Sequence, residues 1–172
     1  MPSVCLLLLA LQGKIKKMAF HHFERTTLLH TDISTAWNYF SSPDNLKEIG
    51  PEYIQVKVMY QSAGDRPYAG QIITYIITPV LGIPLNWMTE ITHVKEKEYF
   101  VDEQRFGPYA LWHHTHLFKV VDGGVEMTDI VSYKMPFGFI GEIAHWLFVK
   151  KQLAGIFDYR SQRLEEIFGN KK

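Results

Sequence analysis

Residues 112–138 read WHHTHLFKVVDGGVEMTDIVSYKMPFG, and this stretch decides the fold. Two alternating runs on either side of a glycine turn at 122–124 predict a β-hairpin. Alternate side chains of a strand share a face, so each strand contributes one inward set of four. The inward sets are Trp112, His114, His116 and Phe118 on the first strand, and Met127, Asp129, Val131 and Tyr133 on the second. Two histidines and one aspartate therefore lie on an otherwise aromatic and apolar face.

The length of the turn sets which of these residues lie opposite each other. A two-residue loop at Asp122-Gly123 places His116 directly opposite Asp129, whereas a loop at Gly123-Gly124 places the two diagonally. Either register keeps both histidines and the aspartate on the aromatic face. Only a three-residue loop would break the alignment.

The two histidines and the aspartate allow three interpretations. With a carboxylate, histidines two residues apart can bind zinc or non-haem iron, but no further His, Cys or Glu cluster is evident in the sequence. An acid/base pair of His116 and Asp129 has the right residue types for catalysis but no evident nucleophile. Buried imidazoles and Asp129 can also satisfy one another inside a cavity and select the polar end of a ligand. We favour this third interpretation and expect no metal and no cofactor.

The rest of the chain supplies a sheet and a helix to cover it. Turn residues between 31 and 46 predict two short helices after the first strand. From Phe139 the apolar residues follow a helical period, which predicts one long helix ending near Gly169. Its apolar face, which we expect to cover the sheet of an α+β fold, comprises Ile140, Ile143, Ala144, Leu147, Phe157 and Leu164. Together with the hairpin, six or seven antiparallel strands are predicted, the others at 20–30, 54–60, 71–78, 85–94 and 99–106.

Composition limits the function classes. A chain of 172 residues fits one domain, and its 18 Lys+Arg balance 18 Asp+Glu, so nucleic acid is a poor partner. Aromatic residues make up 14% of the chain, enough to line an apolar pocket as well as a core. The single cysteine, Cys5, excludes an internal disulfide framework and a multi-cysteine zinc site.

The N-terminal residues match neither a signal peptide nor a membrane span. The run from Val4 to Leu11 is apolar, but no positive residue precedes it, and the lysines follow it. It is also far too short to cross a bilayer as a helix. We expect residues 1–17 to be an extension outside the fold, with the domain at 18–172. A weak signal or an interfacial anchor is the alternative.

Other inward positions add candidates for ligand contact. Asp102 and Gln104 share a strand face with aromatic residues, where a ligand or a cross-strand partner would bind them equally well. Trp87 is expected to point inward from the preceding strand. Arg160, beside Tyr159 on the long helix, reaches towards the cavity mouth, although a structural role is favoured there.

These residues carry a resemblance to a known family. The segments W-x-H-x-H-x-F at 112–118, M-T-D-x-V-x-Y at 127–133 and P-F-G at 136–138 resemble the SRPBCC ligand-binding proteins, a helix-grip superfamily. The family also includes START lipid-binding domains and polyketide cyclase-like proteins. The resemblance covers about residues 18–168, and the branch is often described as cyclase/dehydrase-like or cell-division-inhibitor-related.

The resemblance implies a seven-stranded antiparallel sheet wrapped around the C-terminal helix, with a deep cavity between them. It implies a cytoplasmic protein that binds a small, largely apolar lipid, quinone, polyketide or aromatic molecule. The alternative is a cyclase, dehydrase or hydrolase using the His116–Asp129 pair, because the fold supplies a pocket and not a reaction. A third hypothesis is a partner-binding or membrane-surface protein that uses residues 137–148. The expected ligand contacts are Trp87, Asp102, Gln104, Trp112, His114, His116, Phe118, Asp129 and Tyr133.

Overall fold

A computed structural model describes residues 20–62, 66–78 and 83–169 of the chain. The expected extension at 1–17 and Cys5 lie outside these residues. All strand pairs are antiparallel, and the seven strands form one sheet in the order β1-β7-β6-β5-β4-β3-β2. Their bounds are β1 His21–Leu29, β2 Val56–Gln61, β3 Gln71–Ile77, β4 Leu85–Lys95, β5 Tyr99–Phe106, β6 Leu111–Val121 and β7 Gly124–Lys134. The antiparallel α+β prediction is confirmed.

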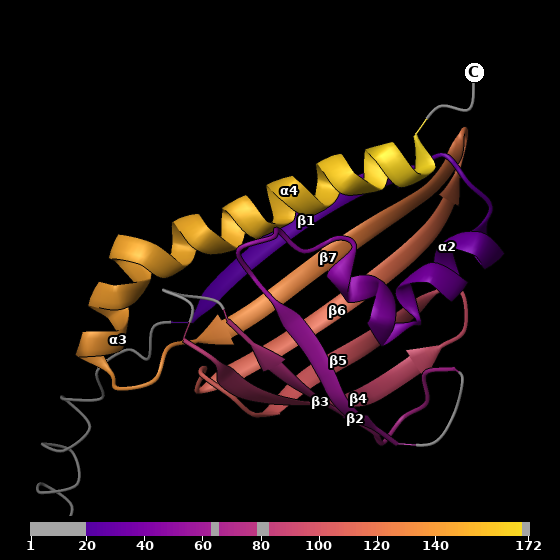
Figure 1. Ribbon diagram of the computed structural model, residues 1–172. Coiled ribbons are helices and arrows are strands. Elements are labelled where there is room, and N and C mark those ends of the chain that lie inside the picture. The colour runs from indigo at the N-terminus through magenta and orange to yellow at the C-terminus, as the bar shows by residue number, and fades with distance from the viewer. Residues whose placement is uncertain (1–19, 63–65, 79–82, 170–172) are drawn as a thin grey trace, which may run out of the picture.

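Helical segments follow the first and the last strand. The first pair is α2, Ile33–Phe40, and the 3-10 turn η1, Pro43–Lys47. Asp32 caps α2 by accepting hydrogen bonds from the backbone N–H groups of Ser34 and Thr35. The final segment runs unbroken through α3 Phe139–Ala144, the π-helical turn η2 His145–Val149 and α4 Lys150–Phe168. Figure 1 shows the sheet curving beneath α4, with α2 and α3 at opposite ends of the molecule.

The β6–β7 turn adopts the predicted register with the loop at Asp122-Gly123. Val121 pairs with Gly124, and His116 pairs with Asp129. Gly123 has a φ of 87°, in the left-handed region that favours glycine. A Cβ at Gly124 would lie 2.0 Å from the carbonyl oxygen of Leu29, so the loop is packed against the end of β1. This register places both histidines and Asp129 on the concave face.

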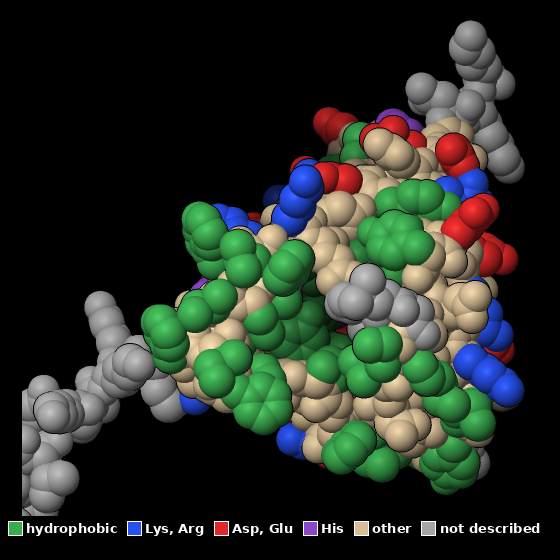
Figure 2. Space-filling view, turned by 60° about the vertical axis from the view of Figure 1, so that its left-hand side comes forward, with side chains coloured by type: hydrophobic (Ala, Val, Ile, Leu, Met, Phe, Trp, Pro, Cys, Tyr) green, Lys and Arg blue, Asp and Glu red, His purple; other side chains and the backbone are tan. Residues whose placement is uncertain are grey.

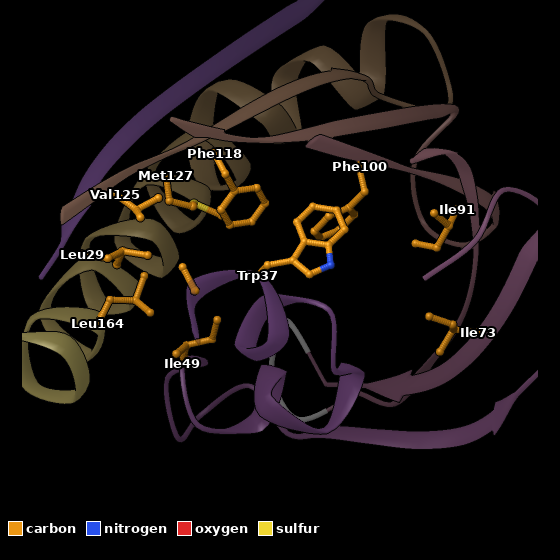
Figure 3. Packing of buried hydrophobic residues seen from close by; sticks show 11 residues of the cluster. Leu29, Trp37, Ile49, Ile73, Ile91, Phe100, Phe118, Val125, Met127 and Leu164 are labelled. Atoms are coloured by element: carbon orange, nitrogen blue, oxygen red, sulfur yellow. The ribbon is translucent and has the colours of Figure 1, made fainter. Parts of the chain in front are cut away.

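Two apolar clusters hold the sheet and helices together. The larger one lies at the α2 end, where Trp37 points between Phe100 and Phe118 (Figure 3). The ring centroids of Trp37 and these two phenylalanines are 5.9 and 5.5 Å apart, with edge-on geometry. The smaller cluster joins β7 to α4 through Val131, Tyr133, Met135, Leu153 and Phe157. Described residues of both clusters line a cavity between the sheet and the helices.

The predicted apolar face of the long helix is correct only for its second part. Phe157 and Leu164 are buried as expected, whereas Ala144 is half-buried and Ile140, Ile143 and Leu147 are exposed. The reason is that α3 and η2 lie at the end of β1 and β7, where the sheet presents the polar side chains of His21 and Tyr133. Within the C-terminal helical segment, α4 is the part that covers the apolar face of the sheet.

Candidate functional site

A cavity of about 360 Å³ lies between the concave face of the sheet, α2, η1 and α4. Most of its wall is apolar or aromatic, with Ile73, Ile91, Trp87, Trp112, Ile156 and Phe157 among the lining residues. Figure 2 shows a hollow on this side of the molecule, surrounded by hydrophobic side chains. A more open groove of about 680 Å³ lies on the outer surface near Arg25 and Glu165, but its wall is polar and its Arg25 is paired with Asp158. The enclosed apolar cavity is the better candidate site.

Five polar residues from four elements meet beside this cavity, and we call them the inner cluster: the half-buried Asp102 of β5, and the buried His114 and His116 of β6, Asp129 of β7 and Arg160 of α4. Nε2 of His114 lies 2.8 Å from Asp129 Oδ1, and Nε2 of His116 lies 2.9 Å from Asp102 Oδ2. Nδ1 of His114 is 3.4 Å from the same Asp102 oxygen. The two carboxylates therefore hold the two imidazole rings between them.

The electrostatics of the cluster separate its two histidines. Burial alone would raise a carboxyl pKa, yet the facing imidazoles outweigh burial and hold the pKa of Asp102 and of Asp129 below the ordinary value. Burial lowers the pKa of His114, and the neighbouring His116 lowers it further. Burial acts in the same direction on His116, but its hydrogen bond to Asp102 and the nearby charges of Asp102 and Asp129 raise its pKa above the ordinary value. The cluster therefore favours a proton on His116 over one on His114.

Two nitrogen atoms of the inner cluster lack a hydrogen-bond partner among the described residues. They are Nδ1 of His116 and Nε of Arg160, and both are buried. Nδ1 of His116 lies 2.9 Å from Asp129 Oδ1, but the angle is not that of a hydrogen bond. Nη1 of Arg160 lies 3.8 Å from Asp129 Oδ2, which pairs the charges without a hydrogen bond. An unpartnered buried donor is unfavourable. Because Arg160 lines the cavity, its Nε is a place for a ligand acceptor, whereas Nδ1 of His116 faces Asp129.

The predicted site residues divide between the cavity wall and the structure behind it. Trp87, Asp102, Trp112, His114 and His116 line the cavity. The other four predicted residues are not among those that line the cavity. Asp129 lies behind the histidines, and Phe118 packs in the larger core cluster. Gln104 hydrogen-bonds the backbone N–H and carbonyl of Tyr109, and the hydroxyl of Tyr133 hydrogen-bonds Nε2 of His145.

Three lining residues were missed or undervalued in the sequence. Tyr75 and Tyr109 both line the cavity, and burial raises the pKa of each hydroxyl. Tyr75 lies on a strand without a polar motif and Tyr109 follows a turn, so neither carries a pattern that marks a site. Arg160 does carry one, because a cation one turn beyond Phe157 lies on the buried face of the helix.

A second polar cluster lies at the other end of the sheet. Nε2 of His21 is 2.9 Å from Glu142 Oε2, and the rings of His21 and His145 stack with centroids 3.5 Å apart. The hydroxyl of Tyr133 is 2.9 Å from Nε2 of His145. We call these four residues the clamp cluster, because they tie α3 and η2 to β1 and β7. Burial, and then His21, lowers the pKa of His145.

Among the described residues, two groups could hold a metal ion. They are Asp102 with His114 and His116, and His21 with Glu142 and His145, and the ligand atoms in each group lie within 4.8 Å of one another. The second group corrects the expectation that no further His, Cys or Glu cluster exists. Glu142 and His145 are close in the sequence, but His21 lies 121 residues before Glu142, and only the fold brings the three together.

Comparisons with known structures show the fold. A protein from Chromobacterium violaceum matches with a TM-score of 0.67 at 13% identity, covering 88% of this chain and 99% of that one. A protein from Mycobacterium smegmatis gives a TM-score of 0.61 at 18% identity, covering 85% and 89%. The major latex-like protein 151 of Panax ginseng gives 0.63 at 12% identity, covering 87% and 97%. These matches define the class as proteins with a helix-grip-like α+β fold.

No protein-family model and no curated protein sequence matches the chain. The likeness therefore rests on the backbone, and at these identities it shows the fold alone. Among the helices that the structure describes, none is long and apolar enough to cross a membrane.

Proposed function

We propose that the protein binds a small, largely apolar molecule of lipid, quinone, polyketide or aromatic type in its internal cavity, as SRPBCC proteins do. The observation that carries the proposal is a mostly apolar cavity lined by Arg160, whose buried Nε has no hydrogen-bond partner among the described residues. Apolar walls supply affinity, and a few fixed polar groups supply orientation. The cytoplasmic location stays a prediction.

The charges of the inner cluster favour an uncharged polar end on the ligand. The carboxylates of Asp102 and Asp129 face the guanidinium of Arg160 and the imidazole of His116, and the charges balance when His116 holds a proton. A charged ligand group would leave a net charge buried, which is unfavourable. A carbonyl or hydroxyl oxygen accepts a hydrogen bond without adding charge. We therefore propose a ligand with such an acceptor at one end of an apolar body.

A matched pair of probes tests this recognition. The ketone α-tetralone and the hydrocarbon tetralin differ mainly in one carbonyl, and their affinities can be compared by calorimetry. A hydrogen bond to a charged donor should favour the ketone by about tenfold or more. The variant Arg160→Met should reduce that preference, whereas Arg163→Met, on the exposed side of the same helix, should keep it. Equal affinity for both probes, or no binding of either, would contradict the proposal.

A second candidate function is acid/base catalysis, which one observation favours. His116 lines the cavity, and its raised pKa favours the protonated form that a general acid needs. Its hydrogen-bonded carboxylate is Asp102, whereas Asp129 hydrogen-bonds His114. His116 and Asp129 therefore lie directly opposite each other on β6 and β7, as predicted, but they do not hydrogen-bond each other. For an enzyme, His116→Ala would abolish turnover while ligand affinity changes by less than about tenfold; equal losses would indicate binding alone.

Metal binding at the inner cluster is less well supported. Each imidazole nitrogen lies within 3.4 Å of a carboxylate oxygen, so a cation would have to displace these contacts. Arg160 adds a positive charge beside Asp129. Dialysis against zinc followed by metal analysis would reverse this ranking if one equivalent were retained by the wild type and lost in His114→Ala.

A further inference from the structure

The first part of the C-terminal helix carries an unusual exposed surface. Seven large hydrophobic side chains lie in and beside α3 and η2, and three of them are more than 70% exposed: Phe137 at 83%, Trp146 at 79% and Ile140 at 71%. We call the set the apolar patch: Phe137, Phe139, Ile140, Ile143, Trp146, Leu147 and Phe148. Figure 2 shows hydrophobic side chains gathered on the protruding left-hand side, next to the hollow. Apolar surface of this extent indicates an interaction site.

The polarity of this helical segment is inverted. Its inward side carries Glu142 and His145, which contact His21 and Tyr133 of the sheet in the clamp cluster. Its outward side carries the apolar patch. Turning the segment over would bury the patch but would break both hydrogen bonds of the clamp cluster. The fold therefore holds the hydrophobic side chains outward.

The turn before α3 has strained backbone that supports the same orientation. Phe137 has a φ of 60°, a left-handed conformation that is uncommon for a residue other than glycine. Gly138 follows with a φ of 54°. The ring of Phe137 is 83% exposed, so burial within the described structure does little to offset this backbone conformation. A binding partner that covered the ring would offset it.

Charge around the patch points to the kind of partner. Between residues 135 and 157 the only acidic residue is Glu142, and it is paired with His21. Lys150 and Lys151 directly follow the patch, and both are exposed. Aromatic and aliphatic side chains next to lysines are typical of helices that lie in the surface of an anionic bilayer. In a self-contact of two copies, the same lysines would add repulsion.

The patch also borders the cavity. Met135, just before it, and Val149, just after it, both line the cavity. A surface that contacted the patch would therefore lie beside that part of the cavity wall.

We propose that the apolar patch docks the protein on an anionic lipid bilayer, with α3 and η2 lying in the interface and the cavity next to the membrane. The patch side chains insert among the acyl chains, and the two lysines contact the headgroups. The docking proposal depends only on the exposed surface described here. We further infer that the docked protein exchanges its ligand with the bilayer, and this step rests on the function proposed above.

Vesicle flotation with the full chain tests the docking. Phosphatidylcholine vesicles containing phosphatidylglycerol should bind the wild type, and the double variant Phe139→Ser/Trp146→Ser should bind at least about tenfold more weakly, since two large apolar side chains no longer leave water. The matched control Tyr53→Ser/Val120→Ser removes two exposed apolar side chains outside the patch and should bind as the wild type does. Lys150→Ala/Lys151→Ala should weaken binding only to vesicles that contain the anionic lipid.

Other outcomes overturn the proposal. Equal binding by the wild type and the patch variant would assign flotation to another segment, such as the apolar run at 4–11. A dimer in sedimentation velocity that the patch variant abolishes, without vesicle binding, would identify a second copy as the occupant. The patch variant should bind α-tetralone with the affinity of the wild type. Its loss of vesicle binding would then report on docking alone and not on the proposed ligand binding.

Discussion

The two halves of the C-terminal helical segment use the same residue types in opposite ways. In α4 the apolar side chains Leu153, Phe157 and Leu164 are buried against the sheet, and the polar residues other than Arg160 are exposed or half-exposed. In α3 and η2 the polar residues Glu142 and His145 face the sheet, and the apolar residues face solvent. The difference lies in the partner surface, which offers apolar residues to α4 and the side chains of His21 and Tyr133 to α3. Each part of the helical segment therefore turns towards the sheet the side chains that match it, apolar ones in α4 and hydrogen-bonding ones in α3 and η2.

The largest expected difference between the halves is in stability. Phe157→Ala removes a buried ring from the smaller core cluster and should lower the free energy of unfolding by about 3–5 kcal/mol. Trp146→Ala, on the apolar patch, should change it by less than about 0.5 kcal/mol, because the side chain is already in water. Urea unfolding of both variants measures the contrast. A large loss from the Trp146 variant would mean that the patch is part of the core.

The inner cluster behind α4 should respond almost as strongly. Asp129→Asn, on β7, keeps the volume but removes the buried counter-charge of Arg160 and leaves His116 with Asp102 alone, so we expect a loss of about 3 kcal/mol. Asp158→Asn, on α4, removes the charge of an exposed partner of Arg25 and should cost less than about 1 kcal/mol. Similar losses in the two variants would show that the inner cluster is not coupled as described.

The clamp cluster should contribute less than the inner cluster. Glu142→Gln weakens a half-buried contact with His21 and should cost about 1 kcal/mol. Hydrogen exchange should rise in α3 and η2 and stay unchanged in α4, because the clamp holds only the first half. Exchange that rises equally along the whole helix would contradict the division into two halves.

The smallest effect is the pH dependence of the two cavity histidines. His116 has a raised pKa, so its contribution to stability is complete below the unfolded value of 6.5 and is lost as pH rises through the folded pKa. His114 has a lowered pKa, so its contribution is present above 6.5 and is lost as pH falls through the folded pKa. Nitrogen-detected NMR titration should show His116 titrating above 6.5 and His114 below it. The reverse order would reassign the charges of the inner cluster.

The sequence predicted the elements well because each is specified locally. Alternation, turn glycines and the Asp32 cap set the strands and the first helix, and the choice between two turn registers decided the pairing of His116 with Asp129. What it did not predict depends on contacts between distant segments. His116 hydrogen-bonds Asp102 instead of Asp129 because β5 pairs with β6 and brings Asp102 within reach of the ring.

The orientation of α3 was missed for the same reason. A helical period identifies an apolar face but not the side on which the sheet lies. The clamp cluster sets the orientation of α3, but His21 and Glu142 are 121 residues apart, so no local sequence pattern predicts their contact.

Occupancy of the cavity tests the central claim most directly. Native mass spectrometry of the purified protein should show a bound small molecule that organic extraction removes. Ile156→Trp, which fills the cavity from α4, should abolish it, while Gly155→Trp, on the exposed side one residue earlier, should retain it. An adduct that is absent from the wild type even after incubation with a lipid extract, or one that persists unchanged in the Ile156→Trp variant, would contradict the account of an internal ligand cavity.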